Sequence, residues 1–371
     1  MNRREFLRRA GLVSGGLVLA PSILAACAGS GASAGGPDHI AISNWTGYMD
    51  PDLLKQFTRD TGIDINYVED INDNSEYFAK VQASLMAKHG IGRDGFVLTD
   101  WMANRMINQV KWVQPLVVDK LPNKKNLRKA LAAPVFDPTR KYSMPWASGV
   151  TGIAYNTDAT GGEIRTFDEF FKVKGTKTVL SEMPDTVGLL MLANGEDAAH
   201  PTYAGAQKAF DQLAEVSGNG TIKGFNGNDY VTDLSSGNLA ACMAWSGDIA
   251  QIALTKPNIK FSVPESGGML WSDNFMIPYT TEKQSAATEF INYWYDPEHA
   301  AQLTAEIQYV SPVSGVTEEL EKMGGDAAEL AQNPLVVPTD ESLNELTIFG
   351  PLAPKEELLF TERFQHILGA G

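Results

Sequence analysis

Cysteine is scarce in this chain, which has only Cys27 and Cys242 among its 371 residues. Two distant cysteines give neither a disulfide framework nor a cysteine cluster that could hold a metal ion. The five histidines are scattered and show none of the spacings typical of metal ligands. We therefore expect no metal and no covalent cofactor. The apolar run from Leu239 to Met243 predicts that Cys242 is a buried thiol.

Basic residues are also few compared with acidic ones. The chain has 30 lysines and arginines against 45 aspartates and glutamates, which gives a net charge of −15. Such an acidic balance disfavours binding to nucleic acid and to anionic ligands, and it is compatible with a cationic ligand. Most acidic protein surfaces only promote solubility, so the charge by itself identifies no ligand.

Catalytic and nucleotide-binding motifs are missing or stand in the wrong context. Residues 31–35 match G-x-S-x-G, but that motif needs a strand before it and a helix after it, and these residues lie in an Ala, Gly and Ser stretch. Residues 90–95 match G-x-G-x-x-G, but a predicted helix precedes them and a predicted strand follows, the reverse of the dinucleotide-binding arrangement. We therefore expect neither a nucleotide cofactor nor an enzyme. A triad assembled from distant residues would show no local motif, and no local motif for one is present here.

No uncharged run is long and apolar enough to make a good transmembrane helix. Residues 10–26 carry no charge, but three glycines and a proline interrupt them, as is typical of a signal peptide. Residues 3–7, R-R-E-F-L, resemble a twin-arginine export signal, and residues 24–27 resemble a lipobox. The sequence thus predicts a signal peptide over residues 1–26 and a lipid on Cys27. General export, and a soluble signal with a chance cysteine, are the alternatives.

The exported part begins with a short tether. Residues 28–36 are all Ala, Gly or Ser, a composition that cannot bury apolar area. We predict that residues 27–36 form a lipid-bearing linker, which holds a folded domain at the outer face of the cytoplasmic membrane or in the periplasm. The remaining chain is long enough for two lobes with their own cores rather than one.

Strand and helix patterns alternate along this remaining chain, which predicts an α/β protein. Asp50 and Pro51 supply an N-cap and a first-turn proline for a helix that Gly62 ends. Thr166 and Glu169 form a capping-box pattern that opens another helix. The other predicted elements are strands at 39–44, 63–68, 95–99 and 177–180 and helices at 74–88 and 285–294.

Tryptophan recurs at the ends of these segments, beside small or acidic residues. Four clusters show this arrangement: residues 44–48 (N-W-T-G-Y), 99–101 (T-D-W), 245–248 (W-S-G-D) and 271–274 (W-S-D-N). In open α/β sheets, ligands bind just beyond the carboxyl ends of the strands. An aromatic face attracts an ammonium by on the order of 2 kcal/mol, and a neighbouring carboxylate accepts a hydrogen bond from the same ammonium. The clusters therefore favour a thin, flexible cation as ligand, with burial of the tryptophans in the core as the alternative.

At these clusters the chain resembles the extracytoplasmic solute-binding proteins of ABC transporters for spermidine and putrescine. The resemblance runs from about Ile40 to His366. Four motifs carry it, in the same order and spacing: residues 43–63 (S-N-W-T-G-Y-M-D-P-D-L-L-K-Q-F-T-R-D-T-G-I); Met144-Pro145-Trp146 with residues 152–156 (G-I-A-Y-N); residues 244–247 (A-W-S-G); and Gly268 with Trp271, Asp273 and Ile277-Pro278.

The resemblance implies a two-lobed periplasmic-binding-protein-like fold of type II. In this fold each lobe is a central mixed sheet flanked by helices, and the lobes close over a polyamine in the cleft between them. We place lobe 1 at residues 37–147 plus 272–312 and lobe 2 at residues 148–271 plus 313–371. The resemblance also implies a monomer that delivers its ligand to ABC permease subunits. The ligand-binding residues that it implies are Trp45, Thr46, Tyr48, Trp101, Trp245, Trp271 and Asp273.

The chain differs from the family in where its acidic residues stand along the binding motifs. Three positions where the family often has an acid carry another residue: Gly47, Met183 and Thr186. Glu182, Asp185 and Asp248 lie near these positions, and we add Asp185 and Asp248 to the predicted ligand-binding residues. Near the C-terminus, Phe349 and Gly350 stand about where the family has a residue that makes a polar contact, which is another mismatch. The expected ligand is therefore a polyamine or another amine-bearing solute. A sensor that signals to a partner protein and an enzyme on the same fold are the alternatives.

Overall fold

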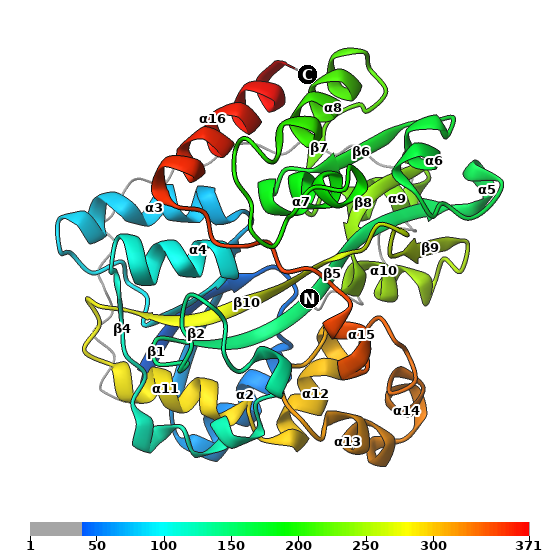
Figure 1. The fold of residues 1–371 in the computed structure, drawn as a ribbon. Coiled ribbons are helices and arrows are strands. Elements are labelled where there is room, and N and C mark those ends of the chain that lie inside the picture. Colours follow the sequence, from blue (N-terminus) through cyan, green and yellow to red (C-terminus); the bar gives the residue numbers. More distant parts are fainter. Residues whose placement is uncertain (1–38, 371) are drawn as a thin grey trace, which may run out of the picture.

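The computed structural model describes residues 39–370, so the predicted signal peptide, the linker and Cys27 lie outside the described residues. Two long strands, β5 (Ser143–Asn156) and β10 (Met269–Pro278), run side by side through the middle of the molecule and join two α/β lobes (Figure 1). The two-lobed α/β arrangement with a mixed sheet that the resemblance implies is therefore confirmed.

Three parallel strands form the core of the first lobe, with β1 in the middle. They are β1 (His39–Trp45), β2 (Asp64–Ile71) and β3 (Gly95–Thr99). Asp50 caps α2 (Pro51–Thr61) by accepting a hydrogen bond from the amide of Asp52, and Gly62 ends this helix with a left-handed φ of 75°. The strands and the helix predicted here are confirmed, with small shifts of their boundaries.

The antiparallel pair β5 and β10 carries the sheet from one lobe into the other. Residues 273–276 of β10 pair with β3, and residues 151–155 of β5 pair with β8 (Ala241–Trp245). The 14 residues of β5 span roughly 46 Å, long enough to pass through both lobes. Between Asp273 and Asn274 the ladder is interrupted, because Trp146 of β5 has no partner in the register and forms a bulge.

The second lobe surrounds β8. Its other strands are β6 (Lys177–Leu180), parallel to β8, β7 (Phe225–Asn226), which pairs with β6, and β9 (Ile259–Ser262), which pairs with β5. The predicted capping box is present at α6 (Phe167–Lys172), where Thr166 accepts from the amide of Glu169 and the Glu169 side chain accepts from the amide of Thr166. Cys242 on β8 is wholly buried and burial raises the pKa of its thiol, which confirms the predicted buried cysteine.

Helices cover the faces of this sheet, whose described strands follow the order β2-β1-β3-β10-β5-β8-β6-β7 (Figure 1). The remaining elements are α3 (Asn74–Met86), α4 (Asp100–Asn104), the π-helix η1 (Arg105–Gln109), β4 (Val113–Gln114), the 3₁₀ turns η2 (Val118–Lys120), η3 (Pro122–Asn126) and η4 (Lys129–Leu131), α5 (Thr157–Thr160), α7 (Met183–Ala193), α8 (Gln207–Gly218), α9 (Tyr230–Ser236), α10 (Ser246–Ala253), α11 (Gln284–Tyr293), α12 (Pro297–Ile307), α13 (Val316–Met323), α14 (Gly325–Leu330), α15 (Asp340–Asn344) and α16 (Pro354–Ala370). Two of these helices, α3 and α11, confirm the predictions at 74–88 and 285–294. Among the helices described, none combines the length and the apolar character that crossing a membrane requires.

The C-terminal segment crosses between the lobes once more. α13 packs on α12 and α15 packs on η4, whereas α16 packs on α8 of the second lobe. Between α15 and α16, the amide of Thr347 donates to the carbonyl of Gly268 at 3.1 Å, and its carbonyl accepts from the amide of Leu270 at 2.8 Å. This segment therefore lies beside the start of β10. The lobe boundaries given above stay a prediction.

Candidate functional site

A hollow lies between the lobes, where β5 and β10 pass from one lobe into the other. Its cavity volume is about 30 Å³, which is room for about two water molecules. The lining consists of Trp45, Tyr48, Thr99, Glu182, Asp185, Asn228, Trp245, Trp271, Asp273 and Tyr309. These described lining residues include three acids and five aromatic side chains, and no lysine, arginine or histidine is among them.

The ends of several elements bring the lining residues together. Trp45 ends β1, Thr99 ends β3 and Trp245 ends β8, so the carboxyl ends of three strands meet at the hollow. This is the edge at which open α/β sheets bind ligands. Glu182 is the N-cap residue of α7 and Asp185 lies in the first turn of that helix, where the helix dipole favours a negative charge.

Aromatic rings form a continuous wall on one side of the hollow. The rings of Trp245 and Trp271 meet edge to face with their centroids 6.3 Å apart. Tyr309 continues the wall, because its ring lies 5.7 Å from Trp271 and 5.2 Å from Tyr48. Such a wall offers π faces to a cation and apolar surface to an alkyl chain.

Two glycines make room for this wall. A Cβ atom at Gly149 would lie 2.4 Å from Cζ2 of Trp271, and a Cβ atom at Gly247 would lie 2.7 Å from the ring of Tyr309. Both distances are far below van der Waals contact, so any larger residue would displace the ring. The close approach of the rings to β5 and to the start of α10 therefore requires glycine at these two positions.

Asp273 is the acid on β10. It accepts a hydrogen bond from the Tyr48 hydroxyl at 2.9 Å and another from the Thr99 hydroxyl at 2.7 Å. Its side chain is buried, and desolvation raises its pKa to about 7, although the bonds from Thr99 and Tyr48 act in the opposite direction. When Asp273 is ionised, its hydrogen-bond donors are the uncharged hydroxyls of Tyr48 and Thr99. Its negative charge is therefore available to pair with a cationic ligand.

Two further acids come from the start of α7. Asp185 accepts a hydrogen bond from the Thr151 hydroxyl, and burial raises its pKa to about 6. Glu182 accepts from both the backbone and the side-chain nitrogen of Asn74, at 3.3 and 3.1 Å. Burial first, and then the charges of Asp73 and Asp185, raise the pKa of Glu182 well above its usual range. Because Asn74 begins α3, this contact bridges the two lobes.

Six of the predicted ligand-binding residues line the hollow, and three do not. The six are Trp45, Tyr48, Asp185, Trp245, Trp271 and Asp273. Thr46 is exposed in the turn after β1, and Trp101 lines a neighbouring hollow instead. Asp248 lies behind the lining, where it accepts hydrogen bonds from the hydroxyls of Tyr230 at 2.6 Å and Tyr309 at 2.9 Å. A ligand contact at any of these residues stays a prediction.

Other lining residues are not among those predicted. Thr99 belongs to the T-D-W cluster at residues 99–101, and Glu182 lies three residues before the predicted Asp185, so both stand close to predicted positions in the sequence. Asn228 and Tyr309 belong to none of the four tryptophan clusters, and no local pattern in the sequence marks them. Only the folded chain brings these two side chains to the hollow.

The three positions without the family's acid do not face the hollow. The amide of Gly47 donates to Oε1 of Glu69 at 3.0 Å. Met183 lines a neighbouring hollow, and the Thr186 hydroxyl donates to the carbonyl of Leu180 at 2.7 Å. The acids at the start of α7 therefore come from the residues beside Met183 and Thr186.

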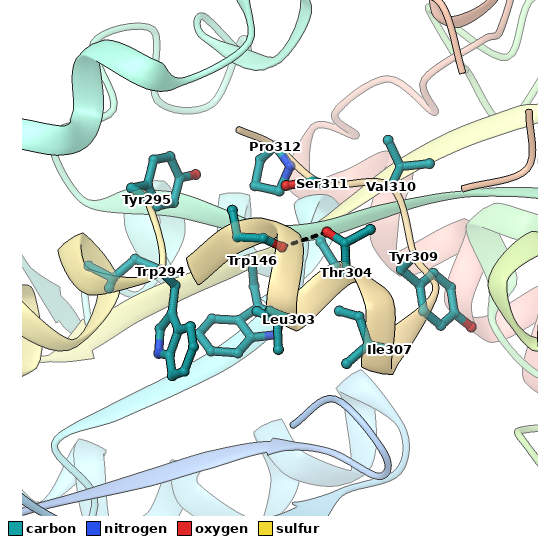
Figure 2. A pocket seen from close by; sticks show the side chains of 13 residues that line it. Trp146, Trp294, Tyr295, Leu303, Thr304, Ile307, Tyr309, Val310, Ser311 and Pro312 are labelled. Atoms are coloured by element: carbon teal, nitrogen blue, oxygen red, sulfur yellow. Dashed lines mark hydrogen bonds between the residues drawn. The ribbon is translucent and has the colours of Figure 1, made fainter. Parts of the chain in front are cut away.

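A second hollow, mainly apolar, lies behind Tyr309 (Figure 2). Its volume of about 10 Å³ is room for one water molecule at most. Figure 2 shows the indoles of Trp146 and Trp294 on one side and Tyr309 at the opposite end, while the Thr304 hydroxyl donates to the carbonyl of Ala300 at 2.8 Å. This packing supports the Tyr309 ring from behind.

Curated relatives and solved structures match nearly the whole chain. PotF, a putrescine-binding periplasmic protein of Escherichia coli, is 29% identical over 354 residues, covering 88% of this chain and 90% of PotF. SpuD, a putrescine-binding periplasmic protein of Pseudomonas aeruginosa, is 26% identical, covering 88% of this chain and 91% of SpuD.

Two solved structures share the fold at lower identity. PotD of Streptococcus pneumoniae, a spermidine/putrescine ABC transporter substrate-binding protein, superposes with a TM-score of 0.73 at 24% identity, covering 90% of this chain and 99% of that one. The TpPotD lipoprotein of Treponema pallidum superposes with a TM-score of 0.74 at 19% identity, covering 89% and 99%. The family model described as bacterial extracellular solute-binding protein matches residues 52–337. This chain therefore belongs to the bacterial extracellular solute-binding proteins.

Proposed function

We propose that this protein captures a polyamine, such as putrescine or spermidine, in the hollow between its lobes and delivers it to the permease of an ABC transporter. The observation that carries the proposal is the lining itself, in which three buried acids stand beside five aromatic side chains and no basic residue is among the described lining. Relatives named for putrescine, PotF and SpuD, support the same class of ligand.

An alkyl diamine suits this lining for electrostatic reasons. A buried ammonium without a partner is costly, so each end of the ligand needs an acid or solvent. Asp273 on β10 would take one ammonium, and Glu182 or Asp185 on α7 would take the other. The alkyl chain between them would lie against the aromatic wall, where each desolvated cation contact contributes on the order of 2 kcal/mol.

Closure of the lobes would retain the ligand. The Asn74–Glu182 contact already bridges α3 of the first lobe and α7 of the second at one side of the hollow. Opening the lobes would break this contact and expose the hollow, and closing them would exclude water from the acids. We propose capture without chemical change to the ligand, by a monomer, in keeping with a family of solute-binding proteins.

Calorimetric titration with putrescine and spermidine tests the proposal, with tryptophan fluorescence as a second readout. We expect saturable binding in the micromolar range or tighter, and a change in fluorescence because three tryptophans line the hollow. A monoamine of equal length should bind more weakly, because it leaves one set of acids without a partner. A response to an amino acid or sugar, with none to any polyamine, would contradict the proposal.

We further propose that the protein is a lipoprotein, exported through the twin-arginine route and anchored by a lipid on Cys27. The support is the lipobox-like sequence at residues 24–27 and the arginine pair at Arg3 and Arg4. Cys27→Ser should move the protein from the membrane fraction to the soluble fraction of the host. Replacing both arginines with lysine should block export, and normal export of that variant would instead indicate the general route.

A further inference from the structure

One buried hydroxyl connects two residues of the candidate site. Thr151 lies on β5, its side chain is wholly buried, and it is not itself among the described residues that line the hollow. Its hydroxyl donates to Oδ1 of Asp185 and accepts a hydrogen bond from the indole Nε1 of Trp271 at 3.0 Å. Asp185 belongs to α7 and Trp271 to β10, so a single oxygen atom joins three elements.

The direction of these hydrogen bonds is fixed by chemistry. An indole N–H can only donate, so the Thr151 oxygen must be the acceptor in its contact with Trp271. The one hydroxyl proton is then available for Asp185, whose ionised carboxylate can only accept. The chain from Trp271 through Thr151 to Asp185 therefore favours the ionised acid and holds the edge of the indole in place.

We propose that Thr151 is a positioning residue of the ligand site, whose hydroxyl sets the Asp185 carboxylate and the Trp271 ring in the relative orientation that an amine ligand requires. This inference rests on the proposed function. β5 contributes to the orientation twice, because Gly149 leaves the space into which the Trp271 ring packs and Thr151, two residues later, binds the edge of that ring.

The electrostatic surroundings of Asp185 make the hydroxyl important. The titratable groups that face Asp185 from its own helix and from the elements packed around the hollows are Glu182, Asp273, Asp100, Tyr48 and Tyr309. None of these is a cation, and burial raises the pKa of Asp185, while hydrogen bonds from Thr151 and Trp245 lower it. Loss of the Thr151 hydroxyl would therefore raise that pKa further and keep the acid neutral over a wider pH range.

Two substitutions separate the hydroxyl from the rest of the side chain. Thr151→Val keeps the shape and removes the hydrogen bonds, whereas Thr151→Ser keeps the hydroxyl. Putrescine affinity is measured on the whole chain, purified in mild detergent, from about pH 5 to about pH 8. We expect Thr151→Val to bind about tenfold more weakly at neutral pH, because hydrogen bonds to charged groups are strong, and to need a higher pH for full affinity. Thr151→Ser should retain the wild-type pH profile.

A matched control comes from another buried threonine. Thr288→Val removes a hydroxyl that donates to the carbonyl of Gln284 within α11 of the first lobe, so it should leave the pH profile unchanged. A merely structural loss at Thr151 would lower affinity equally at every pH. The inference is overturned if Thr151→Val keeps the wild-type profile, or if Thr151→Ser is shifted as far as Thr151→Val.

A second readout needs no ligand. The indole N–H resonance of Trp271, followed by NMR, should shift as Asp185 titrates near pH 6 in the wild type and in Thr151→Ser. In Thr151→Val this resonance should lose the shift, because the connection to Asp185 is gone. If the wild type binds no putrescine, the proposed function fails, while a shift retained in Thr151→Val would overturn the positioning role separately.

Discussion

Asp273→Asn should weaken the binding of a polyamine by about 30- to 1,000-fold, because the buried acid that pairs with an ammonium is lost. Asn has nearly the same shape and can still accept a hydrogen bond from Tyr48 or Thr99, so the hollow should keep its form. Isothermal titration calorimetry at pH 8 measures the change in the dissociation constant. An unchanged dissociation constant would remove Asp273 from the ligand site.

The same substitution should make the empty protein more stable. The pKa of Asp273 is raised to about 7 in the folded state, so its contribution to stability is present below about pH 4 and is lost as the pH rises through 7. Asn never ionises, so at pH 8 the free energy of unfolding should increase by up to about 4 kcal/mol. Urea unfolding at pH 8 and pH 5 tests this, and the gain should shrink at the lower pH.

Asp273→Asn is expected to raise the free energy of unfolding and to lower the polyamine affinity, and this combination distinguishes loss of the acid from misfolding. A variant that merely misfolds would lose both, whereas the expected variant is more stable and binds less. Asp211→Asn is a suitable control, because Asp211 is exposed and only pairs with Arg363 at the surface, so neither quantity should change appreciably. Lower stability of Asp273→Asn at pH 8 would contradict the buried, raised pKa.

Acidification should weaken polyamine binding by roughly 1,000-fold between pH 8 and pH 5. The alkylammonium ligand stays protonated across this range, because such amines have pKa values near 10. Asp273, with a pKa of about 7, is only about 1% ionised at pH 5, and Asp185, with a pKa of about 6, is about 10% ionised. If the ligand requires both acids ionised, the two fractions multiply.

Calorimetry in buffers of different ionisation enthalpy measures this coupling, since binding near pH 6 should release protons. Asp273→Asn serves as the control, because only the smaller dependence from Asp185 should remain. A flat affinity profile from pH 5 to pH 8 would show that the ligand does not pair with these acids.

Two of the predicted tryptophans, at strand ends, line the hollow, whereas two predicted residues in the first turn of the following helices do not. Trp45 and Trp245 each end a strand, and both line the hollow. Trp101 follows β3 by two residues, but α4 begins at Asp100, and Trp101 lines the neighbouring hollow. Asp248 lies in the first turn of α10 and is bonded to tyrosines behind the wall. One turn of helix is enough to move a side chain away from a site, and its direction depends on tertiary packing.

Side chains from distant loops could not be predicted at all. Tyr309 follows α12 and reaches the hollow only because Gly247 leaves space for its ring. Of the two acids at the start of α7, Asp185 was predicted and lines the hollow, whereas Glu182 was only noted as lying near the positions where the family has an acid. In the fold, caps and periodicity predicted α2, α3 and α11. The lengths of β5 and β10 escaped prediction, because buried strands show no alternation.

The bulge between β5 and β10 has a mechanical consequence. The two lobes are connected by one hydrogen-bonded sheet and not by a flexible linker. Any opening of the lobes therefore has to bend the strands themselves. A hydrogen-bonded strand pair resists bending, and it bends most easily at a bulge, where the regular hydrogen bonds are interrupted. The interruption lies opposite Trp146, next to Asp273. The interruption that a bend between the lobes would exploit therefore lies directly beside the buried acid of β10.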